Sequence, residues 1–212
     1  MELVEFSVVV DYDGVLACNQ EVRGRYAREV YGIRGLSSPI KREFVVNTGI
    51  MTQEQYRRLQ LEVSGFWKWV QQMKPIKGVT SVVPFLHREG VQLSIVTSKT
   101  DEIVSGVHYG LLSMAKQWLA KYDLLQYFQE IKGVGYRKSK APVIAEFEPR
   151  PLAFMDDDLG KLLLARGIVE NLFLFSQPHN LNKELPSDVG RIDSWWHFED
   201  VIYQLKSAIL VG

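Results

Sequence analysis

The chain has a single cysteine among its 212 residues. One cysteine cannot form an intrachain disulfide or supply a cysteine-based zinc cluster. The sequence also lacks an apolar run long enough to span a bilayer, and its N-terminus, MELVEFSVVV, lacks the basic segment of a signal peptide. We therefore expect a reduced, cytoplasmic location and no membrane partner.

An excess of charge of one sign is absent as well. Lys and Arg together number 25, Asp and Glu together also number 25, and the formal net charge is zero. A large nucleic-acid footprint requires a basic stripe, so we expect no nucleic-acid partner. The four histidines show no metal-ligand spacing and receive no chemical role. The length and the 46% of hydrophobic residues are typical of one globular domain, or of one core domain with an insertion.

Four short apolar runs have the character of buried strands. None of them alternates cleanly with polar residues, which is typical of strands covered on both faces of a parallel sheet. Helical patterns separate the runs, and this alternation predicts a three-layer α/β fold. The four runs are Phe6–Val10, Leu93–Val96, Leu152–Met155 and Leu172–Phe175.

Residues 19–78 interrupt this alternation and contain no convincing strand. Thr52 and Gln55 form the ends of a capping-box pattern. Apolar residues then recur at spacings of three and four, which predicts one long helix that ends at Pro75 and Gly78. The apolar stripe consists of Tyr56, Leu59, Val63, Phe66, Val70 and Met73.

A shorter helix is expected over Val22–Tyr31. We interpret residues 19–78 as a helical insertion placed directly after the first strand. Residues 1–18 and 79–212 then form the α/β core. The sequence sets no oligomeric state.

Polar residues follow three of the predicted strands. Asp11 and Asp13 end the first run, Thr97 and Ser98 end the second, and the aspartates 156–158 end the third. Because ligands bind at the carboxyl ends of strands in an open parallel sheet, we expect these residues to converge. Converging carboxylates repel each other unless a divalent cation lies among them. Hard oxygen ligands without nearby His or Cys favour Mg²⁺ over zinc.

Magnesium in turn favours a phosphate ester as the small-molecule substrate. Lys138 and Lys140 precede the third strand, and a lysine beside a hydroxyl can cradle phosphoryl oxygens. One carboxylate could attack phosphorus and form an aspartyl-phosphate. A second carboxylate could protonate the leaving oxygen and later activate water.

The order DYDGVL, IVTS, lysine and FMDDD resembles the four motifs of the haloacid dehalogenase-like (HAD) superfamily. The resemblance implies a Rossmann-like core, a C1-type helical cap at the insertion and a Mg²⁺-dependent phosphohydrolase. It makes Asp11 the nucleophile and a metal ligand. It makes Asp13 the general acid and base and a metal ligand through its backbone carbonyl. An aspartate at this second position implies a phosphatase, because dehalogenases of the family lack it.

The remaining motifs extend this resemblance. Thr97 matches the hydroxyl that binds phosphate, and Ser98 and Gly14 complete the expected substrate-binding set. Asp156 matches the acid that coordinates Mg²⁺, and Asp157 matches the acid that supports it. The extra aspartate at 158 could shift this register by one.

The phosphate-binding lysine has two candidates. Lys140 opens the segment KAPVI and suits a lysine in the first turn of a helix, whereas Lys138 suits a lysine several residues before the helix. We favour Lys140 and keep Lys138 as the alternative.

The insertion is expected to hold the specificity of the enzyme. Its basic residues Arg23, Arg25, Lys41 and Arg42 are candidates for contact with an acidic substrate, although most of them are expected to be solvated. The stretches DGVLA, FSQPHN and RIDSWWHF resemble the 5'(3')-deoxyribonucleotidase-like group, which implies a nucleoside monophosphate as one substrate option. The alternative function is a catalytically silent HAD-like protein that binds partners or serves as a scaffold.

Overall fold

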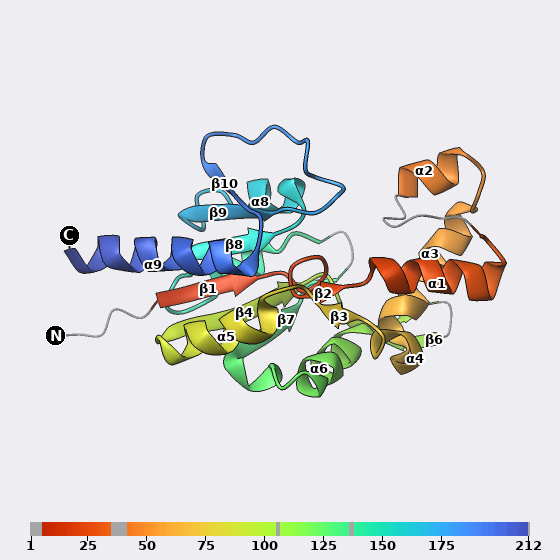
Figure 1. The fold of residues 1–212 in the computed structure, drawn as a ribbon, viewed down its shortest axis with the longest axis horizontal. Helices are drawn as coiled ribbons and strands as arrows, with labels where there is room; N and C mark the ends of the chain where they lie inside the picture. Colours follow the sequence, from red (N-terminus) through yellow and green to blue (C-terminus); the bar gives the residue numbers. More distant parts are fainter. Residues whose placement is uncertain (1–5, 35–41, 105–106, 136–137, 212) are drawn as a thin grey trace.

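A six-stranded parallel sheet forms the centre of the protein (Figure 1). The strand order is β10–β9–β8–β1–β4–β7, and every adjacent pair is parallel. The computed structural model describes residues 6–34, 42–104, 107–135 and 138–211. The strands are β1 (Phe6–Val10), β4 (Val91–Thr97), β7 (Phe128–Gly133), β8 (Ala153–Asp156), β9 (Asn171–Phe175) and β10 (Val189–Ile192).

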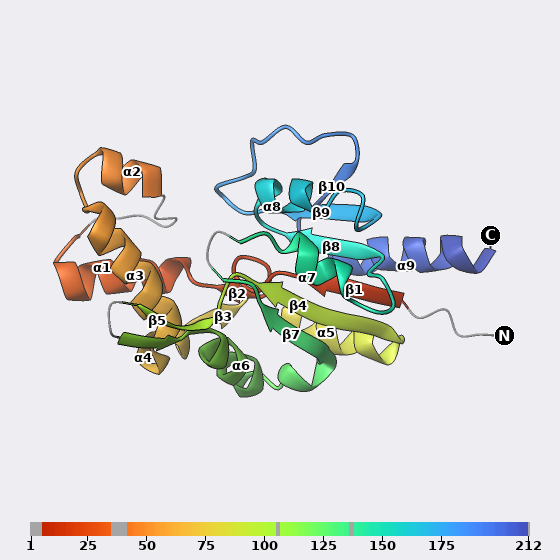
Figure 2. The ribbon, with the colours of Figure 1, turned by 180° about the vertical axis from the view of Figure 1, so that it is seen from behind.

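Helices cover both faces of this sheet. Successive side chains of a strand point to opposite faces, so Val8 and Val10 join one apolar cluster and Val9 joins the other. Helices α5, α6 and α9 contribute to the first cluster, and α7 and α8 contribute to the second (Figures 1 and 2). The predicted three-layer Rossmann-like architecture is therefore confirmed. The helices are α5 (Val79–Arg88), α6 (Leu111–Lys121), α7 (Ala141–Ala145), α8 (Leu159–Leu164) and α9 (Trp195–Val211).

All four predicted strands lie in the sheet, but its two outermost strands were not predicted. Strand β7 is mostly half-buried and contains Glu130 and Lys132, which form an ion pair with 2.8 Å between nitrogen and oxygen. Strand β10 is short and includes Gly190 and Arg191. An outermost strand has only one neighbour, so its sequence does not need the continuous apolar run that marks a central parallel strand.

The inserted helices lie beyond the carboxyl ends of the strands (Figures 1 and 2). Helix α1 ends at Gly32, whose φ of 67° gives the left-handed conformation common at helix C-termini. The predicted start of the next long helix is confirmed, because Thr52 and Gln55 form the reciprocal capping box at distances of 3.1 and 2.8 Å. The inserted helices are α1 (Gln20–Tyr31), α2 (Arg42–Asn47), α3 (Gln53–Gly65) and α4 (Trp67–Val70).

The prediction of one continuous helix as far as Met73 is wrong. The chain breaks at Phe66, which has extended dihedral angles of −115° and 127° and separates α3 from α4. A Cβ atom at Gly65 would lie only 3.0 Å from the ring of Tyr109 and 3.1 Å from Leu111. The ring of Phe66 packs on the ring of Tyr109, with 5.4 Å between centroids. These tertiary contacts override the helical periodicity of the apolar stripe.

Tyr109 belongs to a hairpin that the sequence analysis did not predict. Strands β5 (Asp101–Val104) and β6 (Val107–Gly110) pair antiparallel after β4, and Figure 2 shows the hairpin reaching toward α3 and α4. The carboxylate of Asp101 accepts hydrogen bonds from the first backbone amides of α6 at 2.9 and 3.0 Å. The hairpin is thus tied to α6 through Asp101 and to the inserted helices through Tyr109.

The two connections between core and insertion lie side by side. Strand β2 (Ala17–Cys18) pairs antiparallel with β3 (Lys74–Pro75), so the expectation of no strand between residues 19 and 78 is wrong at one short point. The indole N–H of Trp195 donates to Val15 O at 2.8 Å. The indole N–H of Trp118 donates to Met73 O at 3.0 Å, so both connections are anchored to core helices.

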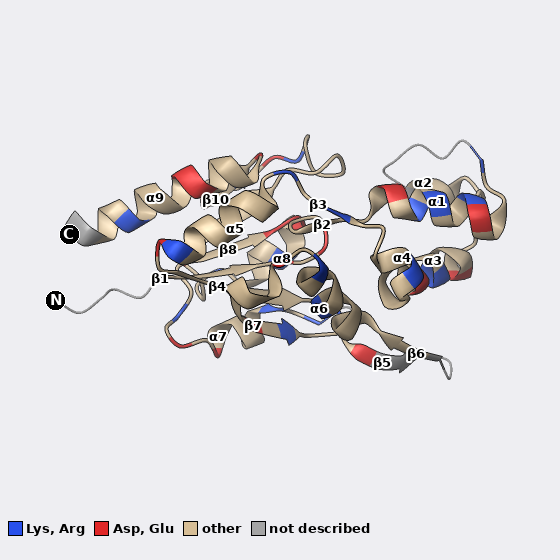
Figure 3. Ribbon diagram, turned by 60° about the horizontal axis from the view of Figure 1, so that its bottom comes forward, with Lys and Arg blue, Asp and Glu red and all other residues tan. Residues whose placement is uncertain are grey.

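Helices α1, α3 and α9 each carry residues of both charge signs (Figure 3). Helix α1 carries Glu21 in its first turn and Arg28 in its last, an order that suits the helix dipole. None of the helices in the described part of the chain has both the length and the apolar character needed to cross a membrane.

Replacing Thr52 with Ala tests the cap of α3. We expect the free energy of unfolding to fall by about 1 kcal/mol, because the amide of Gln55 loses its acceptor. Thr52→Ser keeps the hydroxyl and should remain close to wild type in urea denaturation. Equal losses for both variants would contradict the capping role.

Candidate active site

The centre of the site is a buried lysine between two buried aspartates. Asp11 follows β1 and Asp156 ends the adjacent strand β8, in a register that pairs Val10 with Met155. Lys140 Nζ lies 2.7 Å from Asp11 Oδ1 and 2.7 Å from Asp156 Oδ2. The exposed fractions of Asp11, Lys140 and Asp156 are 2%, 1% and 0%. One cation therefore joins the carboxyl ends of two neighbouring strands.

The two candidate lysines differ in burial and in contacts. Lys140 directly precedes α7 and is buried, whereas the side chain of Lys138 is exposed. Lys140 is thus the lysine that is brought to the carboxylates, and Lys138 is not. The role of Lys140 in binding phosphate stays a prediction.

Three carboxylates form a cluster that could hold a divalent cation. One oxygen of each of Asp11, Asp156 and Asp157 lies within 4.8 Å of the others. Burial raises the pKa of Asp11; the charge of Lys140 opposes this rise and that of Asp156 adds to it. Burial, followed by the charges of Asp156 and Asp11, raises the pKa of Asp157 well above its usual value. The hard oxygen donors of this cluster are of the kind that suit a cation of the Mg²⁺ type.

Asp13 has its own partners. Lys99 Nζ lies 2.9 Å from Asp13 Oδ2, and Asn19 Nδ2 donates to Asp13 Oδ1 at 3.1 Å. Burial alone would raise the pKa of Asp13, but the charge and hydrogen bond of Lys99 hold it below its usual value. Neither Lys99 nor Asn19 was predicted as a site residue. The available signal was their position, because Lys99 lies two residues beyond Thr97 at the end of the same strand.

Thr97 ends β4, which is the other neighbour of β1 in the sheet, and Ser98 follows it directly. Thr97 is 1% exposed, and its Oγ1 accepts a long hydrogen bond of 3.4 Å from the backbone N–H of Lys99. Ser98 is half-buried. Both residues therefore lie at the edge of the sheet that carries Asp11, and their contact with substrate stays a prediction.

Gly14 provides the space for the carboxylate of Asp157. Its φ of 76° lies in the left-handed region, and a Cβ atom there would stand 2.1 Å from Asp157 Oδ2. No side chain fits such a gap, so glycine is required at this turn for its conformation and for the close approach. Its predicted contact with substrate remains untested.

The loop after β9 supplies supporting residues that sequence reasoning missed. Asn180 Nδ2 donates to Asp157 O at 2.8 Å, and Gln177 Nε2 donates to Gly14 O at 2.8 Å. His179 Nε2 lies 3.1 Å from Asp157 O and 3.5 Å from Asp157 Oδ2. The sequence predicts no chemical role for any histidine, yet His179 contacts the acidic cluster. Its place after the fourth predicted strand, at the same sheet edge, was the usable signal.

The basic residues of the insertion differ in their surroundings. Arg23 is half-buried, and Arg25 is exposed and donates to Gln72. Lys41 and the side chain of Arg42 lie outside the described residues.

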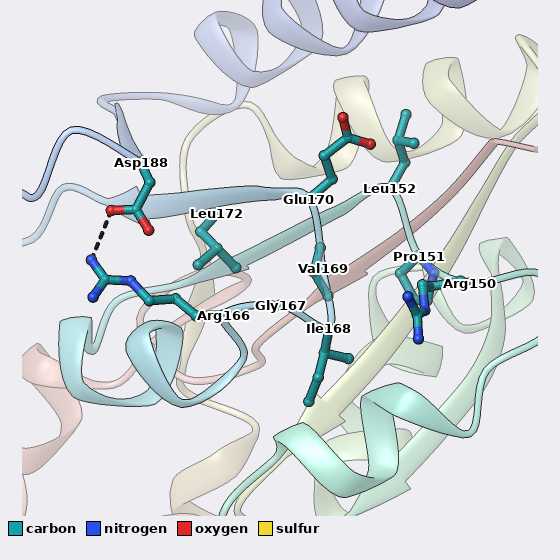
Figure 4. A pocket seen from close by; sticks show the side chains of 10 residues that line it. All are labelled: Arg150, Pro151, Leu152, Arg166, Gly167, Ile168, Val169, Glu170, Leu172 and Asp188. Carbon is teal, nitrogen blue, oxygen red and sulfur yellow. Dashed lines mark hydrogen bonds and ion pairs between the residues drawn. The ribbon is translucent and has the colours of Figure 1, made fainter.

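A surface hollow at the opposite end of the strands is separate from this site (Figure 4). It lies where β8 and β9 begin, and Figure 4 shows Arg166 and Asp188 pointing toward each other across one side, 2.7 Å apart. No predicted site residue lines it. The hollow therefore has no part in the chemistry considered for the acidic cluster.

Replacing Lys140 with Met tests the central ion pairs. Two buried carboxylates lose their shared cation, so we expect the free energy of unfolding to fall by about 3–5 kcal/mol near neutral pH. A carboxyl whose pKa is raised by folding stabilises the folded state at low pH and loses that contribution as pH rises. Without Lys140 the pKa of Asp11 rises further, so the loss should be larger at about pH 8 than at about pH 5.

Lys138→Met is the matched control, since Lys138 is exposed, and its effect should stay within about 0.5 kcal/mol. Equal stability losses for the two variants in denaturant titrations would refute the buried cluster.

Comparison with solved structures identifies the fold. No family model and no curated protein matches the chain, but many solved structures do. A haloacid dehalogenase-like hydrolase from Streptococcus pneumoniae is 16% identical with a TM-score of 0.63, covering 94% of this chain and 98% of that one. The HAD-hydrolase YfnB from Bacillus subtilis, bound to magnesium, is 15% identical with a TM-score of 0.63, and the match covers 93% of this chain and 98% of YfnB. CbbY from Rhodobacter sphaeroides, in complex with phosphate, is 15% identical with a TM-score of 0.61, and the match covers 91% of this chain and 95% of CbbY. The chain therefore has the fold of the HAD-superfamily hydrolases.

Proposed function

We propose that the protein is a Mg²⁺-dependent phosphohydrolase that acts on a small phosphate ester through an aspartyl-phosphate on Asp11. The observation that carries this proposal is the buried contact of Lys140 with both Asp11 and Asp156, beside Asp157. A structural salt bridge needs one carboxylate for one lysine. Here the carboxylates outnumber the lysine at the sheet edge where α/β folds bind ligands.

The acidic cluster is the proposed magnesium site. Asp11, Asp156 and Asp157 would hold the ion through carboxylate oxygens, together with the backbone carbonyl of Asp13. Their oxygens are the hard ligands that Mg²⁺ prefers, and the magnesium-bound YfnB structure supports this choice. When bound, the ion supplies positive charge for the phosphoryl oxygens of the substrate.

The residues divide the chemistry between two carboxylates. A carboxylate oxygen of Asp11 forms a bond to phosphorus while the bond from phosphorus to the leaving oxygen breaks. That oxygen takes a proton from the carboxyl of Asp13. Asp13 then removes a proton from water, the water oxygen attacks phosphorus, and the bond to Asp11 breaks to release phosphate.

The positive and polar groups position the phosphoryl group. Lys140 offsets the negative charge of Asp11, which reduces the repulsion between this nucleophile and the anionic ester. The hydroxyl of Thr97 donates a hydrogen bond to a phosphoryl oxygen. Lys99 holds Asp13 ionised before substrate binds. An approaching anionic ester competes with Asp13 for this lysine, which favours uptake of the proton that Asp13 later donates.

Residues 19–78 are the proposed cap, and residues 1–18 and 79–212 are the proposed core. The inserted helices stand over the carboxyl ends of the strands, where a cap can exclude water from the reaction (Figure 1). The paired segments β2 and β3 form the two connections about which such a cap would move. The YfnB structure is described as revealing interdomain movement, which supports this division.

The substrate class is a small phosphate ester. CbbY has been observed with phosphate and, as a variant, with xylulose-1,5-bisphosphate. A panel of sugar phosphates, phosphorylated carboxylic acids and nucleoside monophosphates spans the options that the sequence leaves open.

Asp11→Asn tests the nucleophile. We expect phosphate release from the best ester of the panel to fall by about 10³-fold or more, because an amide cannot form the acyl-phosphate. Asp158→Asn is the matched control, since Asp158 is exposed and only caps α8 through a 2.9 Å bond from Gly160 N. It should retain near wild-type kcat.

Equal turnover by wild type and Asp11→Asn would contradict the mechanism. Absence of turnover with Mg²⁺ on every ester would favour the catalytically silent alternative.

Magnesium binding should stabilise the protein in a pH-dependent manner. Protons compete with the ion for Asp11 and Asp157, whose pKa values are raised by burial. The rise in Tm on adding Mg²⁺ should therefore be larger at about pH 8 than at about pH 5. Differential scanning fluorimetry of wild type and Asp157→Asn measures this, and the variant should show a smaller Tm rise at both pH values. A Tm rise that is largest at low pH, or unchanged in the variant, would exclude this site.

A further inference from the structure

The start of helix α1 lies beside the carboxylate of Asp13. Asn19 immediately precedes the helix, and its side-chain amide donates to Asp13 Oδ1 at 3.1 Å. Arg23 stands one helical turn further on, and its backbone N–H donates to Asn19 O at 3.0 Å. Residues four apart share a helix face, so Arg23 lies on the face that Asn19 directs at Asp13.

Two polar atoms on this part of α1 are buried without a partner. Among the described residues, the Nε of Arg23 and the Oε1 of Gln20 are both shielded from solvent and form no hydrogen bond. Gln20 and Arg23 are three residues apart and are therefore neighbours on the helix surface. Buried unsatisfied donors and acceptors are rare in folded proteins, because leaving them unpaired destabilises the fold. A ligand that accepts from Arg23 and donates to Gln20 would satisfy both atoms.

The direct contacts of Asp13 leave Arg23 free for another partner. Lys99 Nζ lies 2.9 Å from Asp13 Oδ2, and Asn19 Nδ2 donates to Asp13 Oδ1 at 3.1 Å. Arg23 therefore lies on the helix face directed at Asp13, while the hydrogen bond and ion pair of that carboxylate are made by other residues.

We propose that Arg23, with Gln20 beside it, binds a second anionic group on the leaving part of the substrate, either a carboxylate or a phosphate. The inference rests on the proposed function and specifies its substrate class. The planar guanidinium can donate two parallel hydrogen bonds to either anion, and the amide oxygen of Gln20 can accept from a neighbouring hydroxyl. Phosphorylated carboxylic acids and sugar bisphosphates meet this requirement. Nucleoside monophosphates, with a single phosphate and no other anion, do not.

Ligand binding to the Asp11→Asn protein tests the proposal without turnover. Isothermal titration calorimetry in Mg²⁺ would compare phosphoglycolate, a sugar bisphosphate and phenyl phosphate, which lacks a second anion. Adding Arg23→Gln should weaken binding of the better two-anion ligand by about 10-fold to 100-fold, and clearly more than binding of phenyl phosphate. Arg23→Lys keeps the positive charge but not the planar guanidinium that donates two parallel hydrogen bonds. It should therefore give a smaller loss of affinity.

Arg28→Gln is the matched control, because Arg28 is exposed on the same helix and the substitution removes the same charge. It should bind all three ligands as the Asp11→Asn parent does. Circular dichroism melting of the two glutamine variants would exclude a folding defect as the cause of any difference.

The remaining outcomes are equally decisive. Equal weakening of phenyl phosphate and the two-anion ligands by Arg23→Gln would place Arg23 at the shared phosphoryl position and overturn the proposal. Unchanged binding of all ligands, or no preference of the parent for two anions, would also overturn it. The tighter of phosphoglycolate and the bisphosphate identifies the anion as carboxylate or phosphate. Selective binding without any turnover by the wild type would refute the proposed hydrolysis and leave the Arg23 subsite standing.

Discussion

The site depends on one buried ammonium group. Lys140 contacts Asp11 and Asp156 at 2.7 Å each, and all three side chains are almost completely shielded from water. Without this cation, the two carboxylates that β1 and β8 bring to the same edge of the sheet would lose their shared ion pair, and the charge of Lys161 would offset their repulsion only in part. With it, the negative charge of Asp11, Asp156 and Asp157 still exceeds the positive charge in contact with them. That remaining negative charge is what suits the site to a divalent cation.

The core of this arrangement was predictable from the sequence. Central parallel strands are covered on both faces, so they appear as apolar runs, and the polar residues that end them mark the ligand-binding edge. Asp11 and Asp156 were predicted in this way, whereas Lys140 was favoured over Lys138 because it opens the segment KAPVI. The outer strands β7 and β10 were not, because a strand with one neighbour carries no such run.

The missed features arise from contacts between segments distant in sequence. Phe66 ends α3 because the hairpin after β4 packs against Gly65, and no local pattern encodes that contact. Lys99 and His179 lie beside Asp13 and Asp157 because the loops after β4 and β9 turn toward the same point. Single residues in loops have no periodicity, so their roles depend on geometry that only the folded chain supplies.

The proposed mechanism requires that Asp11 becomes covalently phosphorylated. Its most direct test is to quench the wild-type protein during turnover of a phosphate ester with Mg²⁺, reduce any acyl-phosphate with borohydride, and locate the reduced residue by peptide mass spectrometry. We expect a single modified aspartate at position 11, absent when Mg²⁺ is omitted. Modification of another carboxylate, or turnover with no acyl-phosphate detected on any peptide, would contradict it.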